Sequence, residues 1–241
     1  KNEIRNDSLL IRNSEIINTS ATISDHESAF IAAKKGKETS MWKSIESQKN
    51  NNLDITLSAG NTGALVVISR LILNTISGIN KPALAGLWPN ENNMNVVLDL
   101  GANIECTEKN LVDFACMGSA LFKSLFSVEF PKIALLNVGL EEHKGNDVLK
   151  KTHNILKNNE IKNFDYCGFI EGNQIMDGNI DVIITDGFTG NVALKTAEGT
   201  ANFISSELKN ALKSSIFGKL GSLISIGSLK KFKKKLDPRL Y

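Results

Sequence analysis

The amino-acid sequence predicts an α/β fold with three layers, α/β/α, in which helices cover both faces of a mostly parallel sheet. Two observations support this class: short apolar runs alternate with helical patterns along the chain, and each run ends in glycine with an asparagine close by. Strands that alternate with helices are joined by right-handed crossovers, which makes neighbouring strands parallel. The 241 residues, 41% of them hydrophobic, are enough to bury a core. We expect a single α/β domain over residues 1–241.

Five apolar runs are expected to form the strands, because near-continuous apolar runs of this length are typical of strands buried on both faces. In chain order they are residues 53–61, 95–103, 133–139, 166–173 and 181–187. Residues 9–13 are a weaker sixth candidate.

Helical spacing of apolar residues fills most of the gaps between these runs. It predicts helices over residues 63–73, 111–126, 147–156 and 192–212, and a surface helix within 38–52. Residues 111–126 are apolar almost all round, so we expect the sheet or another subunit to cover this helix on most sides.

Composition and spacing exclude several classes of protein. No apolar run approaches the ~18 residues of a membrane-spanning helix. Three scattered cysteines are too few for a disulfide scaffold, and no signal-peptide pattern follows Lys1, so a cytoplasmic protein is expected. The sequence contains neither the G-x-x-x-x-G-K-[ST] motif of ATP-binding proteins nor a G-x-G-x-x-G dinucleotide motif after any predicted strand, so it does not indicate an ATP or NAD site. The three histidines lack metal-ligand spacing and are expected at the surface, and the two tryptophans lack the interleaved basic residues of nucleic-acid binding.

Polar side chains follow each predicted strand, at the edge where ligands of open α/β sheets bind. They are Ser58, Asn61, Asp99, Asn103, Asn137, Glu171, Asn173, Asp186 and Asn191. For any one of these turns, a tight turn or a helix cap is the better explanation. Five such turns on one rim predict a polar cleft lined with glycine.

Two of these turns lead directly into helices and are candidates for binding an anion. They run from Ser58 to Ala64 and from Thr185 to Asn191. Glycines let backbone N–H groups approach an anion, and a helix N-terminus adds about half a positive charge. Lys195 lies one helical turn after Asn191, so we expect its ammonium beside the same site. The expected members of this single anion site are Asn61, Thr62, Gly63, Thr189 and Asn191.

Five distinctive segments follow one another in a fixed order. They are Ser58-Ala-Gly-Asn-Thr-Gly-Ala-Leu65, Lys81-Pro-Ala-Leu84 with Leu87-Trp-Pro89, Val97-Leu-Asp-Leu-Gly-Ala-Asn103, Thr185-Asp-Gly-Phe-Thr-Gly-Asn-Val-Ala-Leu-Lys-Thr-Ala-Glu-Gly199 and Leu236-Asp-Pro-Arg239. These segments resemble the bacterial phosphate acyltransferase family of phospholipid synthesis, from about residue 14 to residue 241. Members of that family have a further strand before the first segment and continue past the last one, so the resemblance implies a chain that is incomplete at both ends.

The resemblance implies an enzyme that converts long-chain acyl-acyl-carrier-protein and inorganic phosphate into acyl phosphate. It also implies a homodimer without an organic cofactor, with a fold similar to those of phosphotransacetylases and the isocitrate and isopropylmalate dehydrogenases. The implied partners are the acyl-acyl-carrier-protein, phosphate, a second copy of the chain, an anionic membrane surface and a downstream membrane acyltransferase. No nucleic acid is expected, and the expected location is cytoplasmic with peripheral attachment to the membrane.

The candidate catalytic residues are Lys195, Asn191 and Asp186. Candidates for binding phosphate or the acyl donor are Ser58, Gly60, Asn61, Thr62, Gly63, Asp99, Asn103, Asn137, Glu171, Asn173, Gly187, Thr189 and Gly190. No metal ligands are expected. Asp99 and Asp186 are expected to orient hydrogen-bond donors rather than to transfer protons. In the loop 137–145, Leu140 and His143 depart from the family pattern, while Glu141, Glu142 and Lys144 remain as candidates.

The implied reaction needs no nucleophilic side chain, because phosphate is itself nucleophilic near neutral pH. The protein must hold this anion against the thioester and stabilise the oxyanion that forms. A thiol leaving group, with a pKa of about 8.5, needs little help from a general acid. Two alternatives stay open: a phosphotransacetylase-like enzyme that uses short acyl-coenzyme A, and a non-catalytic membrane-associated scaffold with the same fold.

Residues 212–236 form an amphipathic basic segment. Seven lysines and no acidic residue lie between positions 213 and 235, whereas the rest of the chain carries 21 basic and 26 acidic residues. A stripe of Leu, Ile and Phe beside lysines is typical of a helix that lies in a bilayer interface. We expect a helical hairpin broken by its glycines, Gly218, Gly221 and Gly227. The expected membrane contacts are Leu220, Leu223, Ile224, Lys230 and Lys231, and an ordinary helix packed on its own domain or on a partner subunit is the alternative.

Overall fold

The computed structural model describes residues 8–51, 53–158 and 163–236, and the chain divides into two units. The first unit is residues 1–77 and the second is residues 78–241. That both units belong to one catalytic domain stays a prediction.

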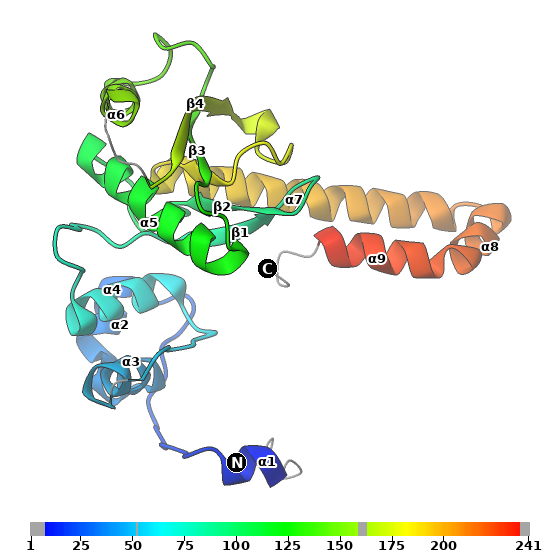
Figure 1. Ribbon diagram of the computed structural model, residues 1–241. Helices are drawn as coiled ribbons and strands as arrows, with labels where there is room; N and C mark the ends of the chain where they lie inside the picture. The colour runs from blue at the N-terminus through cyan, green and yellow to red at the C-terminus, as the bar shows by residue number, and fades with distance from the viewer. Residues whose placement is uncertain (1–7, 52, 159–162, 237–241) are drawn as a thin grey trace. The chain divides into compact units, whose positions relative to one another are not determined.

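The second unit contains a five-stranded sheet in the order β1-β2-β5-β3-β4. Figure 1 shows this sheet, with labels on β1 to β4. Its strands are β1 (Ala85–Pro89), β2 (Met94–Leu98), β3 (Lys132–Asn137), β4 (Asp165–Glu171) and β5 (Val182–Ile184). β1 is antiparallel to β2, and all other neighbouring strands are parallel. The four parallel strands coincide with four of the predicted apolar runs. β1 was not predicted, because its Gly86 and Pro89 argue against a central strand, although an edge strand accepts both.

Helices cover both faces of this sheet. On one face, α5 (Glu108–Phe126) and α6 (Asp147–Asn158) bury Phe114 and Leu156 against Val96 and its neighbours. On the other face, α7 (Gly187–Lys213) packs Leu194 against the cluster that contains Val97. Successive residues of a strand point to opposite faces, so one apolar run supplies both cores. The predicted three-layer α/β/α class is confirmed.

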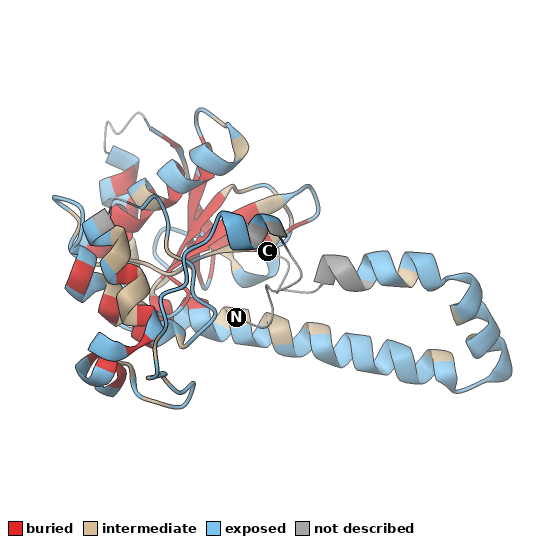
Figure 2. Ribbon diagram, turned by 90° about the horizontal axis from the view of Figure 1, so that it is seen from below, coloured by how far each residue is buried: buried red, intermediate tan, exposed pale blue. Residues whose placement is uncertain are grey.

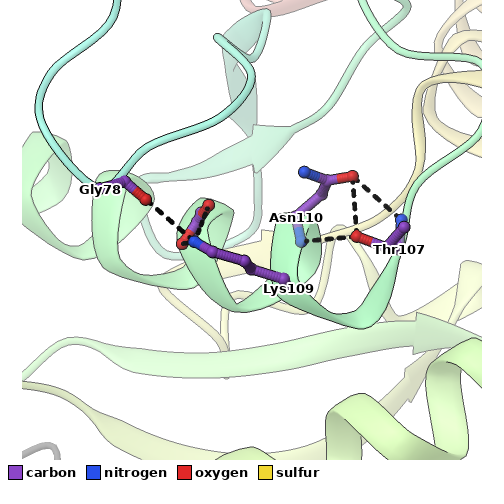
Figure 3. Close-up of polar contacts among 5 residues, drawn as sticks. Gly78, Thr107, Lys109 and Asn110 are labelled. Carbon is purple, nitrogen blue, oxygen red and sulfur yellow. Dashed lines mark hydrogen bonds and ion pairs between the residues drawn. The ribbon is translucent and has the colours of Figure 1, made fainter.

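α5 begins at a well-formed cap at the edge of the sheet. The Thr107 side chain accepts a hydrogen bond from the Asn110 backbone at 3.3 Å, and the Asn110 side chain accepts one from the Thr107 backbone at 3.0 Å (Figure 3). In the same first turn, Lys109 donates to the Gly78 carbonyl at 2.9 Å and pairs with Asp113, one turn along the helix, at 3.1 Å. These bonds fix the start of α5 to the first residue of the second unit.

The outer side of α5 is less covered than the sequence predicts. The sheet buries the side that carries Phe114 and Phe122, but Cys116, Leu121 and Leu125 are exposed in the single chain. The sheet alone therefore does not cover α5 on most sides, and the predicted cover by the sheet or another subunit stays a prediction. Cover by another subunit is taken up below as a proposal.

The C-terminal part of the second unit consists of three consecutive helices. α7 continues far beyond the sheet, and α8 (Ile216–Ile224) and α9 (Ile226–Leu236) follow it. The outer part of α7 and all of α8 lack buried residues (Figure 2). The predicted interruption of this helical segment is present, but it lies at serines and not at the glycines. Ser215 caps α8 by accepting a hydrogen bond from Gly218 N, and Ser225 is the single residue between α8 and α9. Gly218 instead allows close approach, since a Cβ there would lie 2.6 Å from the Leu212 carbonyl oxygen.

The first unit is helical. Its helices are α1 (Ser8–Arg12), α2 (Ala29–Lys35), a single 3-10 turn (Gly36–Glu38), α3 (Ser40–Asn51) and α4 (Thr62–Leu73). Ile45, Ala64 and Ile68 form the centre of its core. α3 and α4 match predicted helices, whereas α2 was not predicted.

Two predicted strands of the first unit are wrong. Residues 9–13 lie mostly in α1, because five residues carry too little pattern to separate a strand from a helix. Residues 53–61 are irregular, with Ile55 and Leu57 exposed. A strand needs a neighbour for its backbone hydrogen bonds, and the described part of the first unit contains no strand that supplies one.

Candidate functional site

Three helices begin around one edge of the sheet in the second unit. β2, β3 and β5 are parallel neighbours, so their carboxyl ends meet at this edge. The turn after β2 leads to α5, the loop after β3 leads to α6, and the turn after β5 leads directly to α7. Ligands of open α/β sheets bind at such an edge.

Asp99 organises the turn that follows β2. It is fully buried, and its Oδ1 accepts hydrogen bonds from the backbone N–H groups of Leu84, Gly101 and Ala102 at 2.9–3.2 Å. Its Oδ2 accepts two more from the backbone and side chain of Asn103, both at 2.7 Å. All these hydrogen bonds lie within the chain, so the Asp99 carboxylate holds the backbone of this turn. Its contact with a substrate and its role in orienting donors stay predictions.

The turn after β5 is held by its own first residues. Asp186 caps α7, with Oδ1 accepting from Thr189 N at 2.7 Å and Oδ2 accepting from the Thr189 hydroxyl at 3.1 Å. Gly187 N donates to the Asn103 carbonyl at 2.8 Å, which joins this turn to the turn after β2.

Two glycines allow the start of α7 to touch the turn after β2. A Cβ at Gly187 would lie 2.6 Å from the Asn103 carbonyl oxygen, and a Cβ at Gly190 would overlap the Asp99 carbonyl oxygen. Gly101 has φ +133°, a conformation that L side chains rarely adopt, and a Cβ there would be 3.5 Å from the Asn191 side chain. The two turns are therefore packed directly against each other, with Asn191 exposed beside Gly101.

This arrangement changes the interpretation of the glycines near α7. From the sequence alone, these glycines are expected to let an anion approach backbone N–H groups. In the structure, the N–H groups of Gly187 and Thr189 are already bonded to Asn103 and Asp186. The glycines serve close backbone approach, and the binding of an anion at the start of α7 stays a prediction.

Lys195 is on α7, one turn after Asn191, as predicted. Its side chain is exposed, and its Nζ pairs with Glu198 Oε2 at 2.8 Å, further along the helix. The ammonium therefore does not point to the start of α7 in this structure.

At the ends of β3 and β4, the predicted site residues Asn137 and Glu171 make hydrogen bonds to neighbouring parts of the chain. Asn137 donates to the carbonyls of Gly139 and Lys144 at 3.0 and 3.2 Å and so holds the following loop. Glu171 caps the turn Gly172–Gln174 together with Gln174, and Asn173 is exposed.

The loop after β3 is also attached to α6. Glu142 Oε1 pairs with Lys157 Nζ at 2.6 Å and lies 3.5 Å from Nε2 of His153, whose Nδ1 is 2.8 Å from the Tyr166 hydroxyl. The hydrogen bond from Lys157 holds the pKa of Glu142 below its ordinary value. His153 is buried, so its expected surface position is wrong. Glu141 pairs with Lys144 within the same loop.

The predicted residues of the first unit form a separate turn. Asn61 caps α4 by accepting from Ala64 N at 3.0 Å, and its amide donates to the carbonyls of Ser24, Asp25 and Glu27. Ser58 accepts from Gly60 N at 3.2 Å, while Thr62 and Gly63 are exposed. The anion site shared with residues of the second unit stays a prediction.

A cavity of about 580 Å³ opens among the starts of α5, α6 and α7. Its lining residues are Ile104, Glu105, Cys106, Leu111, Asn146, Val148, Leu149, Asp186, Phe188 and Thr189. Asp186 and Thr189 were candidates from the sequence, but the apolar members were not. Burial raises the pKa of the Cys106 thiol to about 11, so this thiol is protonated at neutral pH and is a poor nucleophile. Among the described residues, no group of three or more potential ligands is placed to hold a metal ion.

Comparison with known protein sequences identifies relatives over nearly the whole chain. A sequence model of the family described as "Fatty acid synthesis protein" matches residues 2–241. The phosphate acyltransferase of Pelagibacter ubique is 58% identical over 227 residues, covering 94% of this chain and 68% of that protein. Those of Paracoccus denitrificans and Caulobacter vibrioides are 46% and 44% identical, covering 86% and 93% of this chain. The chain spans 56% and 62% of the lengths of these two proteins.

Comparison with solved structures supports the architecture. The EutD phosphotransacetylase from Staphylococcus aureus superposes with a TM-score of 0.52 at 16% sequence identity. The match covers 83% of this chain and 72% of that protein. At this identity the similarity concerns the fold alone.

Proposed function

Because the chain belongs to the fatty acid synthesis protein family, whose curated relatives above are named phosphate acyltransferase, we propose that it makes acyl phosphate. The acyl donor is acyl-acyl-carrier-protein, the acceptor is inorganic phosphate, and the other product is the free carrier protein. One structural observation supports this proposal most: the turns after β2 and β5 form a single body at the carboxyl edge of the sheet, beside a cavity.

The proposed chemistry assigns few tasks to the protein. A phosphate oxygen attacks the thioester carbonyl, a C–O bond forms, and the C–S bond then breaks to release the thiolate. Positioning of phosphate and stabilisation of the oxyanion lower the barrier. We assign a donor role to the exposed side-chain amide of Asn191 at the start of α7, because the Thr189 hydroxyl already donates its hydrogen bond to Asp186. Asp186 holds the Thr189 hydroxyl through its Oδ2 and so acts as a positioning residue.

The proposal is tested with purified full-length protein. Incubation with long-chain acyl-acyl-carrier-protein and phosphate should produce acyl phosphate, trapped with hydroxylamine as the hydroxamate. Parallel reactions with short acyl-coenzyme A separate this activity from that of a phosphotransacetylase-like enzyme. Absence of turnover with both donors would contradict the proposal and leave the non-catalytic scaffold.

We propose that the Lys195 ammonium leaves Glu198 and turns to phosphate when phosphate binds. Replacing Lys195 by alanine is then expected to raise the KM for phosphate by at least about tenfold, because a charge-assisted hydrogen bond contributes roughly 1.5–3 kcal/mol. Stability should change by less than about 1 kcal/mol, since exposed ion pairs such as Lys195–Glu198 contribute little. Lys209→Ala removes the same charge further along α7 and serves as the control. Unchanged phosphate kinetics in Lys195→Ala would remove Lys195 from the site.

We also propose that α8 and the start of α9 contact an anionic membrane surface. Leu223 and Ile224 are 73% and 87% exposed, and Leu220 is exposed on the same helix. Lys230 and Lys231 follow on α9, and each lysine near an anionic leaflet contributes about 1 kcal/mol. None of the described helices has the length and apolar character to cross a membrane. A helix that lies in the bilayer interface does not need to cross the membrane, because only its apolar face enters the bilayer.

Changing both Leu223 and Ile224 to aspartate is expected to abolish co-sedimentation with vesicles that contain anionic lipid. The unchanged protein should bind these vesicles and lose binding as salt is raised, because ions screen the lysines. Ile16→Asp with Ile17→Asp, at two exposed positions of the first unit, changes the net charge equally and should still bind. Equal sedimentation of the Leu223 and Ile224 variant and its parent would make α8 a structural helix only.

We further propose that the protein is a homodimer. Leu121 and Leu125 on α5, and Phe203 and Ile204 on the outer part of α7, are exposed apolar side chains that a second copy would cover. Light scattering at micromolar concentration tests this state.

Since acyl phosphate has an apolar tail, we propose that it passes at the membrane to a downstream membrane acyltransferase.

A further inference from the structure

The cavity among the starts of α5, α6 and α7 has an apolar wall that phosphate does not need. Phosphate requires hydrogen-bond donors and positive charge, whereas six of the ten lining residues are apolar or a neutral thiol. Phe188 and Ile104 are 60% and 59% exposed at this cavity. Large apolar side chains kept in contact with water around a cavity are typical of a ligand site.

The floor of the cavity is continuous with the hydrophobic core. Leu111 is fully buried within the core on this face of the sheet, and Val148, Leu149 and Cys106 pack against the same cluster. A ligand that enters the cavity therefore meets aliphatic side chains held in place by the sheet. The raised pKa of the Cys106 thiol agrees with a poorly hydrated wall.

The charges around the cavity restrict what it can bind. Its lining contains two carboxylates, Glu105 and Asp186, and no lysine or arginine. The Lys81 ammonium donates to the backbone carbonyl of Glu105 at 3.0 Å, next to the lining. An anionic group is disfavoured deep in such a cavity, and a neutral apolar chain is favoured. A volume of about 580 Å³ falls within the usual range of small-molecule sites, roughly 300–1,000 Å³.

We propose that this cavity binds the alkyl chain of a long-chain acyl donor. This assignment rests on the proposed function. The alkyl chain lies along Val148, Leu149 and Phe188, and the thioester carbonyl lies at the polar end beside Thr189. Phosphate then occupies the opposite side of Thr189, towards Asn191 and away from the two carboxylates. The cavity thereby selects donors by the length and shape of their acyl chain.

Filling the cavity tests this assignment. Val148→Trp is expected to lower the ratio of kcat/KM for a hexadecanoyl donor to kcat/KM for a butanoyl donor about tenfold or more, because each methylene in an apolar pocket is worth roughly tenfold or more. Ile155→Trp places the same side chain on the same helix, outside the lining, and should leave this ratio unchanged. An unchanged ratio in a folded Val148→Trp variant would overturn the proposal and leave acyl phosphate synthesis intact.

A second measurement does not require turnover or a cavity mutation. In a Cys116→Ser and Cys167→Ser background, Cys106 is the remaining thiol and can be labelled slowly with N-ethylmaleimide at pH 9. A hexadecanoyl thioether analogue of the donor should protect it at least fivefold, whereas inorganic phosphate should not. Protection without turnover would support the cavity assignment and contradict only the proposed function. Turnover without protection would overturn the cavity assignment.

Discussion

Gly190→Ala is expected to lower acyl phosphate synthesis by about a hundredfold. The added methyl group would overlap the Asp99 carbonyl oxygen and lie 2.9 Å from Thr185 Cγ2, so the start of α7 must move away from the turn after β2. A displacement of about 1 Å in a positioned site can cost roughly a hundredfold in rate. Overpacking of this kind also destabilises a fold by about 1–3 kcal/mol.

Gly199→Ala provides the matched control on the same helix. A Cβ at Gly199 would meet no atom within 4 Å, and alanine is favoured over glycine inside a helix by roughly 1 kcal/mol. This variant should keep full activity and unfold at a slightly higher temperature. Activity is compared as kcat/KM for phosphate, and stability by thermal unfolding. Wild-type activity in Gly190→Ala would show that contact between α7 and the β2 turn is not required.

Asp99→Ala is expected to lower the free energy of unfolding by at least about 3 kcal/mol. The carboxylate accepts five hydrogen bonds in a fully buried position, and its removal leaves the N–H groups of Leu84, Gly101 and Ala102 without their acceptor. Each buried unsatisfied donor costs roughly 1–3 kcal/mol. Because Asn103 also loses its partner, the turn that carries Gly187 should lose its position and its activity together.

Urea unfolding measures this loss, with Glu129→Ala, an exposed acidic position, as the control. Asp99→Asn separates charge from shape, since it keeps one oxygen but turns an amide towards donors. The loss in free energy of unfolding in Asp99→Asn should lie between those in Asp99→Ala and Glu129→Ala. A loss below about 0.5 kcal/mol in Asp99→Ala would show that the turn holds its shape without this carboxylate.

The sequence alone predicted the sheet because its strands are buried on both faces. Residues 96–98 and 182–184 are continuous apolar runs followed by glycine turns, and such runs leave few alternatives. Residues 53–61 have a similar composition but find no neighbouring strand in the described part of their unit. Pairing is a tertiary property that a local pattern does not contain.

The candidate site was predicted in location more than in detail. Asp186 and Thr189 line the cavity, which agrees with the general observation that ligands of open α/β sheets bind at the carboxyl ends of the strands. The close approach of Gly190 to the Asp99 carbonyl depends on how α7 packs on the turn after β2, which no spacing in the sequence records. Val148 and Phe188 were overlooked because apolar residues in the first turn of a helix resemble ordinary core.

The position of β5 in the sheet also affects how the chain is made. β5 lies between β2 and β3, and it pairs Val182 with Val96 and Ile133. During synthesis, β2 and β3 leave the ribosome while their common neighbour is still untranslated, so both present open apolar edges. The central layer closes only when residue 184 has emerged. We therefore expect a nascent chain stalled before that point to bind chaperones and to be cleaved by proteases.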